Sequence, residues 1–374
     1  MIGSWMHRAW RREGIVGKTL WLLLVPLSGI FSAGVGLRNA SFYLPWRRPL
    51  ALGRPAISIG NLTVGGTGKT PSCIWLARAL KRKGLRAAIL TRGYGGNRSA
   101  PCIFLSSGNG TVALASPEEL AAAGDEPCMM AKIYGQTVAV SRDRLLAARE
   151  LLSRSDIDVF ILDDGFQHRR VKREADIVLL GSDASGWILP AGPFREPPKA
   201  LARADFLLVT DAENEWARRM SSFREKQSFK GSLVPVGLVG YQESQWKEYP
   251  LSLLHRNKIV AVAGIAHPER FYRLLYDFES DIVDVLEFPD HHAYSSGDWQ
   301  HINRAGRAAE LIVTTEKDII KLARFPFARG KLVALRVEMV VENGDELVAA
   351  LAERCASRER AGKAQEAKSE KRDL

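Results

Sequence analysis

The sequence predicts an α/β protein in which helices sandwich a mostly parallel sheet, together with a second, smaller α/β domain and an N-terminal apolar helix. Three observations support this fold class. Short, fully apolar runs alternate with helical patterns, the alternation restarts after residue 240, and an uncharged apolar stretch lies near the start. Strands that are apolar on both sides are typical of parallel sheets whose two faces are covered by helices.

The composition is that of a globular protein. The chain has 374 residues, of which 46% are hydrophobic and 25% are charged, so a mostly disordered chain is excluded. The length indicates two domains or one large one. None of the four cysteines has CxxC spacing, which argues against a disulfide framework or a cysteine zinc site and favours a reducing compartment.

The first 45 residues are predicted to form a membrane-associating helix. Residues 1–54 hold eight basic side chains and one acidic side chain, and residues 19–37 carry no charge. About 20 apolar residues are needed to span a bilayer. The stretch could therefore be a secretory signal, a single span, a helix lying in one leaflet of an anionic membrane surface, or a core helix.

Residues 46–230 are predicted to form the larger domain, to which residues 342–354 return. Its expected strands lie at residues 56–60, 87–91, 137–141, 158–163, 176–180 and 206–210, and its expected helices at residues 69–83, 117–134 and 142–153.

Residues 241–330 repeat the alternation on a smaller scale. Two flanking apolar runs, 231–240 and 331–341, are predicted to pair as a two-stranded hinge. Residues 355–374 are charged and nearly free of apolar side chains, so we expect a disordered tail there. The expected strands of the smaller domain are 258–264, 282–288 and 311–315, and its expected helices are 268–278 and 297–309.

The strongest motif is a glycine-rich loop between a predicted strand and a predicted helix, the context that a phosphate-binding loop requires. Its backbone N–H groups can face phosphate oxygens, Lys69 can reach the β- and γ-phosphates, and Thr70 can hold Mg²⁺. The alternative is a strand–helix turn without a ligand. The residues expected to bind the phosphates are Thr63, Val64, Gly65, Gly66, Thr67, Gly68, Lys69 and Thr70.

This loop predicts a P-loop NTPase-like domain, although Thr63 occupies the first glycine position of the usual pattern. Nucleotide is cytoplasmic, so the secretory-signal interpretation of the N-terminus is disfavoured. A second motif supports the prediction, because a buried strand ends in Asp163 and Asp164. A carboxylate at such a strand end is the usual ligand of Mg²⁺ and its waters.

Four further motifs have ordinary structural interpretations when each is taken alone. The segment TRGYGG could be a tight turn, GDEP a helix cap, and DHHAY a surface loop with an Asp–His pair. The motifs are TRGYGG at 91–96, GDEP at 124–127, PFRE at 193–196 and DHHAY at 290–294.

Taken together, these segments resemble the tetraacyldisaccharide 4′-kinase family, the lipid A 4′-kinases. The motifs GNLTVGGTGKTP, TRGYGG, GDEP, LDDGFQH, PFRE, FPDHHAYS and TTEKD occur in that family's order over residues 15–340. The resemblance implies a kinase that moves the γ-phosphoryl group of ATP, with Mg²⁺, to the 4′-hydroxyl of an acylated glucosamine disaccharide 1-phosphate. It also implies work at the cytoplasmic face of the bacterial inner membrane, and we expect a monomer.

The resemblance assigns roles to several residues whose roles cannot be inferred from their sequence context alone. It implies Asp125 as the base, with His291 beside it and Asp290 orienting that histidine. It places Gln167 at the nucleotide, and Arg195 and Glu196 near the phosphates or the closing domain. Tyr94 and Arg144 are further expected neighbours.

Two other classes of protein were weighed. A membrane-associated deviant-Walker regulatory ATPase would carry a lysine where this chain has Val64. Nucleic-acid binding is suggested by the net charge of +11, but that charge is concentrated beside apolar residues and no recognisable module is present. We therefore expect no nucleic-acid partner.

Overall fold

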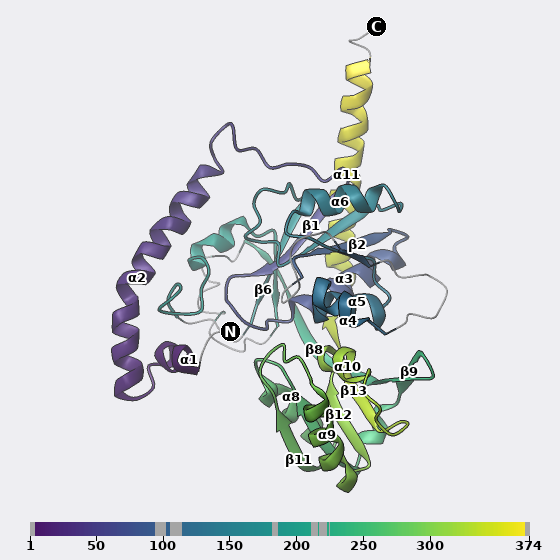
Figure 1. Cartoon of the computed structure of the whole chain (residues 1–374). Coiled ribbons are helices and arrows are strands. Elements are labelled where there is room, and N and C mark those ends of the chain that lie inside the picture. Colours follow the sequence, from purple (N-terminus) through teal and green to yellow (C-terminus); the bar gives the residue numbers. More distant parts are fainter. Residues whose placement is uncertain are drawn as a thin grey trace. The chain divides into compact units, whose positions relative to one another are not determined.

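The computed structural model describes residues 4–93, 102–104, 114–181, 186–210, 216, 223 and 225–370 (Figure 1). The chain forms two compact units, and neither is a single continuous segment. Unit 1 consists of Met1–Ala87, Leu152–Ser232 and Val340–Leu374, and unit 2 of Ala88–Leu151 and Leu233–Met339.

Unit 1 contains a parallel sheet in the order β5-β1-β6-β7, which the start of β8 extends. Every residue of β1, β5 and β6 is buried, which confirms the prediction of a parallel sheet with covered faces. Ile59 of β1 pairs with Asp163 of β5, so these two strands end side by side. The strands are β1 Ala56–Asn61, β5 Val159–Asp163, β6 Ala175–Leu180, β7 Phe206–Val209 and β8 Gln227–Gln242.

Helix α3, Lys69–Arg82, follows the glycine-rich loop as predicted, and helix α11, Gly344–Glu370, returns the chain to unit 1. The expectation of a disordered tail at 355–374 was wrong as far as Glu370; residues 371–374 lie outside the described part. The Ala, Glu, Lys and Arg residues of this segment favour a helix even without an apolar face. A short 3₁₀ helix, η1, covers Pro198–Arg203.

Helix α2, Gly14–Ser41, is long and apolar enough to cross a membrane, and α1, Ser4–Arg11, precedes it. Among its residues only Gly17, Ser28 and Val35 are buried, so the alternative of a buried core helix was wrong. Ile15 is 85% exposed and Leu37 is 75% exposed. A long helix that leaves its apolar side chains in contact with solvent requires another partner surface.

Unit 2 contains a parallel group of strands in the order β11-β10-β12-β13 and a smaller group in which β4 pairs with β2 and with β3. Strand β9 pairs antiparallel with β8. The strands are β2 Ala87–Thr91, β3 Cys102–Phe104, β4 Val138–Val140, β9 Gln245–Tyr249, β10 Lys258–Ala263, β11 Asp281–Glu287, β12 Leu311–Thr315 and β13 Leu332–Val341. The helices are α4 Pro117–Ala123, α5 Asp125–Lys132, α6 Arg144–Leu152, η3 Leu251–Leu254, α8 Pro268–Tyr276, α9 Ser296–Ala305, η4 Gly306–Ala308 and α10 Glu316–Leu322.

The helix predicted over residues 117–134 is two helices, α4 and α5, that are separated by Gly124. This glycine has φ +89° and ψ 165°, a conformation that interrupts the helix and that glycine adopts without steric cost. Pro127 lies in the first turn of α5, where its missing N–H costs no helical hydrogen bond. The break places Asp125 at the start of a new helix.

The division into units differs from the predicted domains, because residues 1–45 and the segment after residue 354 fall within unit 1. Residues 88–151 belong to unit 2 and not to the larger domain predicted over 46–230. The two predicted hinge runs correspond to β8 and β13, which are hydrogen-bonded neighbours. The chain first passes to unit 2 after Ala87 and returns after Leu151, and it passes a second time within β8 and returns within β13.

Candidate active site

The glycine-rich loop is shaped by its glycines. Gly65 and Gly68 have φ values of +123° and +83°, which side-chain-bearing residues rarely adopt. Gly68 is the N-cap of α3 and has no side chain, and its carbonyl accepts the first helical bond from Ser72. The N–H groups of the first turn of α3 can therefore bind an anion.

The PFRE segment lies directly against the first half of this loop. Val64 N–H donates to the Pro193 carbonyl at 2.9 Å, and Arg195 N–H donates to the Leu62 carbonyl at 2.7 Å. Thr63 and Phe194 form an antiparallel bridge between the same two segments. This backbone pairing places the Arg195 side chain at the loop.

Asp164 links the two cations of the site. Both of its oxygens accept hydrogen bonds from Arg195, at 2.9 and 2.8 Å, and Lys69 Nζ lies 3.7 Å from Oδ1. Lys69 also donates to Asn61 Oδ1 at 3.2 Å. Asp164 has φ +51°, so the chain turns sharply straight after β5. The two cations and the carboxylate lie where a polyphosphate on the loop would need charge compensation.

Asp163 points toward α3. Its Oδ1 lies 3.7 Å from the thiol sulfur of Cys73, a fully buried side chain of α3. Burial, and then the negative charge of Asp163, raise the pKa of the Cys73 thiol well above its usual value. Cys73 is therefore a neutral donor to Asp163 and not a nucleophile.

The structure places Gln167 beside the loop and turns Glu196 toward the N-terminal helix. Gln167 Nε2 donates to the Asn61 carbonyl at 2.9 Å. Glu196 is 1% exposed and accepts hydrogen bonds from Asn39 of α2 at 2.8 Å and Arg203 at 3.1 Å. Glu196, which was expected near the phosphates, therefore has its carboxylate engaged by α2 and η1.

The remaining loop residues are close to the same strand ends. Thr67 is 8% exposed and accepts a hydrogen bond from Asn61 Nδ2 at 3.0 Å, and Thr70 is also 8% exposed.

Among the described residues, no cluster of three or more histidine, cysteine or acidic side chains could hold a metal on its own. Mg²⁺ is typically bound by one or two carboxylates and completes its shell with phosphate, hydroxyl and water oxygens. The oxygen donors of Thr70, Asp163 and Asp164 fit that requirement.

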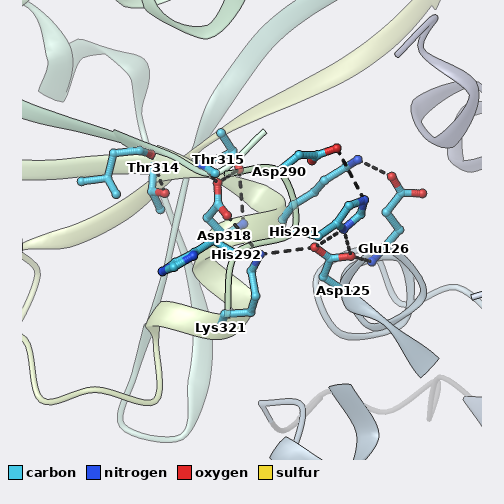
Figure 2. Close-up of polar contacts among 12 residues, drawn as sticks. Asp125, Glu126, Asp290, His291, His292, Thr314, Thr315, Asp318 and Lys321 are labelled. Atoms are coloured by element: carbon cyan, nitrogen blue, oxygen red, sulfur yellow. Dashed lines mark hydrogen bonds and ion pairs between the residues drawn. The ribbon is translucent and has the colours of Figure 1, made fainter. Parts of the chain in front are cut away.

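In unit 2, Asp125 and His291 form a close pair, as Figure 2 shows. His291 Nδ1 lies 3.1 and 3.0 Å from the two carboxylate oxygens of Asp125. An ionised carboxylate can only accept a hydrogen bond, so Nδ1 carries the hydrogen. Asp290 Oδ2 lies 3.8 Å from Nε2, on the other side of the imidazole.

The local charges keep the Asp125 carboxylate ionised and favour the protonated form of His291. Burial alone would raise the pKa of Asp125, but the hydrogen bond from His291 and the charge of Lys321 outweigh it, and the pKa lies well below its usual range. The hydrogen bond to Asp125 raises the pKa of His291 against the opposing effect of burial. Because the two groups are in direct contact, they titrate as a unit.

The structure corrects one expectation about this pair. The sequence places Asp125 and His291 in different domains, which would require closure between domains to bring them together. Both lie in unit 2, because residues 88–151 belong to it, and they are hydrogen bonded there without any such movement.

Several residues of the site escaped the sequence reasoning. Asn61 contacts Lys69, Thr67 and Gln167, yet an asparagine that ends a strand carries no distinctive signal. Lys321, which lies 3.3 Å from Asp125, follows the TTEKD motif but was not singled out.

Two further residues were expected near the site. Arg144 is buried and donates to the Ser141 carbonyl, and Tyr94 lies outside the described residues.

A parallel α/β sheet whose first strand leads into a glycine-rich loop and a helix, with acids at the end of the adjacent strand, defines a P-loop nucleotide-binding protein. More narrowly, the chain belongs to the LpxK family, tetraacyldisaccharide-1-P 4′-kinase, whose model matches residues 20–356. The predicted fold class and family are thereby confirmed.

Relatives and a solved structure cover nearly the whole chain. The tetraacyldisaccharide 4′-kinase of Syntrophus aciditrophicus (strain SB) is 41% identical over 343 residues, which are 86% of this chain and 89% of that protein. The enzyme of the same name from Pelobacter propionicus is 35% identical and covers 91% and 94% of the two chains. The crystal structure of an "apo" form of LpxK from Aquifex aeolicus in complex with ATP is 31% identical, with a TM-score of 0.73, and covers 90% and 99%.

Proposed function

We propose that the protein is an ATP-dependent kinase that phosphorylates the 4′-hydroxyl of a tetraacyldisaccharide 1-phosphate in lipid A biosynthesis. The observation that carries this proposal is the preformed Asp125–His291 pair in a chain that also holds a phosphate loop. A sugar hydroxyl is a poor nucleophile, so a positioned acid–imidazole pair that accepts its proton accelerates its attack.

The residues of unit 1 would supply charge compensation for the nucleotide. Lys69 and Arg195 share Asp164 as a partner, and Lys69 also donates to Asn61. Bound phosphates would offer both cations a more highly charged partner. When bound, Mg²⁺ would neutralise phosphate charge, with Thr70, Asp163 and Asp164 as its proposed protein ligands. Gln167 would orient the loop through Asn61.

The residues of unit 2 would supply the base. Asp125 accepts the hydrogen of Nδ1 and so fixes the imidazole of His291, while Asp290 lies nearer Nε2. With Nδ1–H donated to Asp125, Nε2 of the neutral imidazole is the free acceptor, so the hydroxyl proton would pass to Nε2 and the Asp125 carboxylate would stabilise the imidazolium that forms. We also propose that β8 and β13, within which the chain crosses between the units, form a hinge.

One assay tests this function directly. Purified protein is incubated with Mg-ATP and the acylated disaccharide 1-phosphate, and phosphate incorporation into the lipid is followed. We expect transfer to the 4′ position. ATP hydrolysis without lipid phosphorylation would instead favour the regulatory ATPase class.

The two acids at the end of β5 lead to a prediction about metal dependence. Asp163→Asn and Asp164→Asn should each raise the Mg²⁺ concentration needed for half-maximal activity by about tenfold or more, because each removes a charged oxygen donor. The measurement is a Mg²⁺ titration at fixed ATP.

Asp156→Asn provides the matched control. Asp156 lies in the same unit, but its side chain is 81% exposed and pairs with Arg86. Its titration curve should match that of the unchanged protein. Unaltered Mg²⁺ curves for both Asp163→Asn and Asp164→Asn would remove these acids from the proposed metal site.

We further propose that the protein works as a monomer at the cytoplasmic face of the inner membrane, where α2 contacts an anionic surface. A substrate with several acyl chains leaves a bilayer only at about 0.8 kcal/mol per CH₂ group, so the enzyme must come to the lipid. Arg12 lies 4.1 Å from the ring centroid of Trp21, and Leu22, Leu23 and Ile30 are each at least 66% exposed. Basic and aromatic side chains beside exposed apolar ones suit a lipid headgroup region.

This proposal predicts a loss of vesicle binding. Deleting residues 1–37, or replacing Leu23 and Ile30 together with glutamate, should lower the bound fraction about tenfold or more, because charges on an inserted face are costly. Sedimentation with vesicles that contain anionic lipid measures the effect, and added salt should weaken the electrostatic part.

Tyr276→Glu serves as the control, since Tyr276 is 62% exposed on α8 of unit 2. It should bind vesicles as the unchanged protein does. If the Leu23/Ile30 variant sedimented with vesicles as well as the unchanged protein does, α2 would not be the membrane contact.

A further inference from the structure

We propose that Asp318 and Lys321, one turn apart on α10, are positioning residues that hold both members of the Asp125–His291 pair in place. The inference rests on the proposed kinase function and adds to it two residues that no part of the proposed chemistry has used. Figure 2 shows both side chains beside the pair.

Asp318 reaches His291 through a single residue, Gly264. Its Oδ2 accepts a hydrogen bond from Gly264 N–H at 2.9 Å, and the carbonyl of the same Gly264 accepts from His291 N–H at 3.2 Å. His291 has φ +60°, a conformation uncommon for a residue with a side chain, so its backbone must be held by its surroundings. Gly264 and Asp318 supply that support.

Asp318 reaches Asp125 through Lys321. Lys321 Nζ lies 3.2 Å from Asp318 Oδ1 and 3.3 Å from Asp125 Oδ2. Lys321 is 8% exposed, and Nζ lies 5.4 Å from the ring centroid of Tyr294. A buried ammonium group between two carboxylates is held at a fixed position, and it fixes the second carboxylate in turn.

Helix capping alone does not account for Asp318. Its N–H and side chain exchange hydrogen bonds with Thr315, the N-cap of α10, as Asp298 does with Ser295 at the start of α9. The side chain of Asp298 is 25% exposed, whereas Asp318 is 0% exposed. A helix cap does not require burial. The buried position of Asp318 is therefore explained by its further contacts with Gly264 and Lys321.

The charges that face the pair come from three elements. Lys317 and Lys321 of α10 face α5, where Glu126 pairs with Lys317 and Asp125 contacts Lys321, and Asp290 of the loop after β11 faces His291. Lys321 is thus the cation in direct contact with Asp125, and Asp318 is the anion that partly offsets it. Removing Lys321 should therefore raise the pKa of the Asp125–His291 pair, and removing Asp318 should lower it.

The test measures kcat against pH for Lys321→Met, Asp318→Asn and the double variant, with saturating ATP and lipid. Loss of the Lys321 cation raises the pKa of the Asp125–His291 pair. The acidic limb of the kcat–pH profile, where the pair becomes protonated, should therefore move to higher pH by about one unit. Loss of the Asp318 anion should move the limb to lower pH. The double variant should return the limb toward its original position without restoring kcat.

The single variants should also lower kcat by about 10- to 100-fold, because a slightly misplaced base is an inefficient one. The apparent KM for ATP should stay nearly unchanged, since the loop and its cations lie in unit 1. Lys321→Arg keeps the charge and should restore the pH limb. A side chain that only packs would lower the amount of folded protein and leave the limb where it was.

Two matched controls accompany these variants. Lys331→Met removes a half-buried lysine of unit 2, which donates to the Ala309 carbonyl. Asp298→Asn removes the capping carboxylate of α9, which faces His292. Neither should move the limb. Thermal unfolding checks that each variant is folded. If Asp318→Asn does not fold, the pH profile of Lys321→Met is sufficient to test the positioning role.

The outcomes separate this inference from the function on which it rests. If the unchanged protein phosphorylates the lipid and the limb does not move in Lys321→Met, or moves downward, the positioning role is wrong. If the unchanged protein transfers no phosphate to the lipid, the proposed function fails first.

Discussion

Lys69→Ala is expected to lower phosphoryl transfer by about three orders of magnitude or more, while the fold survives. The side chain is the one cation of the P-loop itself, and its ammonium group lies among Asn61, the Gly65 carbonyl and Asp164. A group that neutralises developing phosphate charge in a water-excluded site contributes several kcal/mol to the transition state. The measurement is single-turnover transfer of labelled phosphate from ATP to the lipid.

Lys81→Ala is the matched control for this variant. Lys81 lies on the same helix, α3, but in its last turn, where the side chain is exposed. It should transfer phosphate at the rate of the unchanged protein. Near-normal turnover in Lys69→Ala would show that the loop does not hold the reacting nucleotide.

The second large effect concerns the Asp125–His291 pair. Asp125→Ala and His291→Ala should each lower kcat by about 10²- to 10⁴-fold, the usual contribution of a positioned acid or base, with little change in the apparent KM for ATP. Because His291 has a positive φ, His291→Asn is a useful second variant, since asparagine tolerates that conformation better than alanine does.

The double variant distinguishes a cooperating pair from two separate residues. If the hydrogen bonds at 3.0 and 3.1 Å make the two groups one base, removing both should cost far less than the sum of the two single free-energy losses. Strictly additive losses, or full activity in either single variant, would mean that Asp125 only begins α5 and that His291 is only a loop residue.

The sequence was sufficient to predict the phosphate loop and most strands of both units, although not β3 or β9, because those features are local. Continuous apolar runs mark β1, β5 and β6, and Gly-Lys-Thr after a strand marks the loop. The roles of Asp125 and His291 came from the resemblance, since neither residue's neighbours in the chain reveal a partner 166 positions away.

Other features depended on contacts that periodicity does not encode. The break at Gly124 matches the interpretation of GDEP as a helix cap, but that interpretation was not applied to the helix predicted over residues 117–134. The assignment of residues 88–151 to unit 2 depends on contacts between distant segments. Asp318 follows Thr315 as an ordinary capping acid would, and nothing in that local pattern shows that it also reaches Gly264.

The interleaving of the two units has a consequence for how the protein is made. Residues 88–339 include all of unit 2, whereas unit 1 also needs the segment from Val340 onward, including the part of α11 in which Gly344 packs against Trp75 of α3. During synthesis, therefore, unit 2 can be complete on the ribosome while the P-loop unit still lacks its last helix. The apolar helix α2 leaves the ribosome long before unit 1 or unit 2 is complete. Translation at the membrane would therefore shield this helix until the last segment of unit 1 has been synthesised.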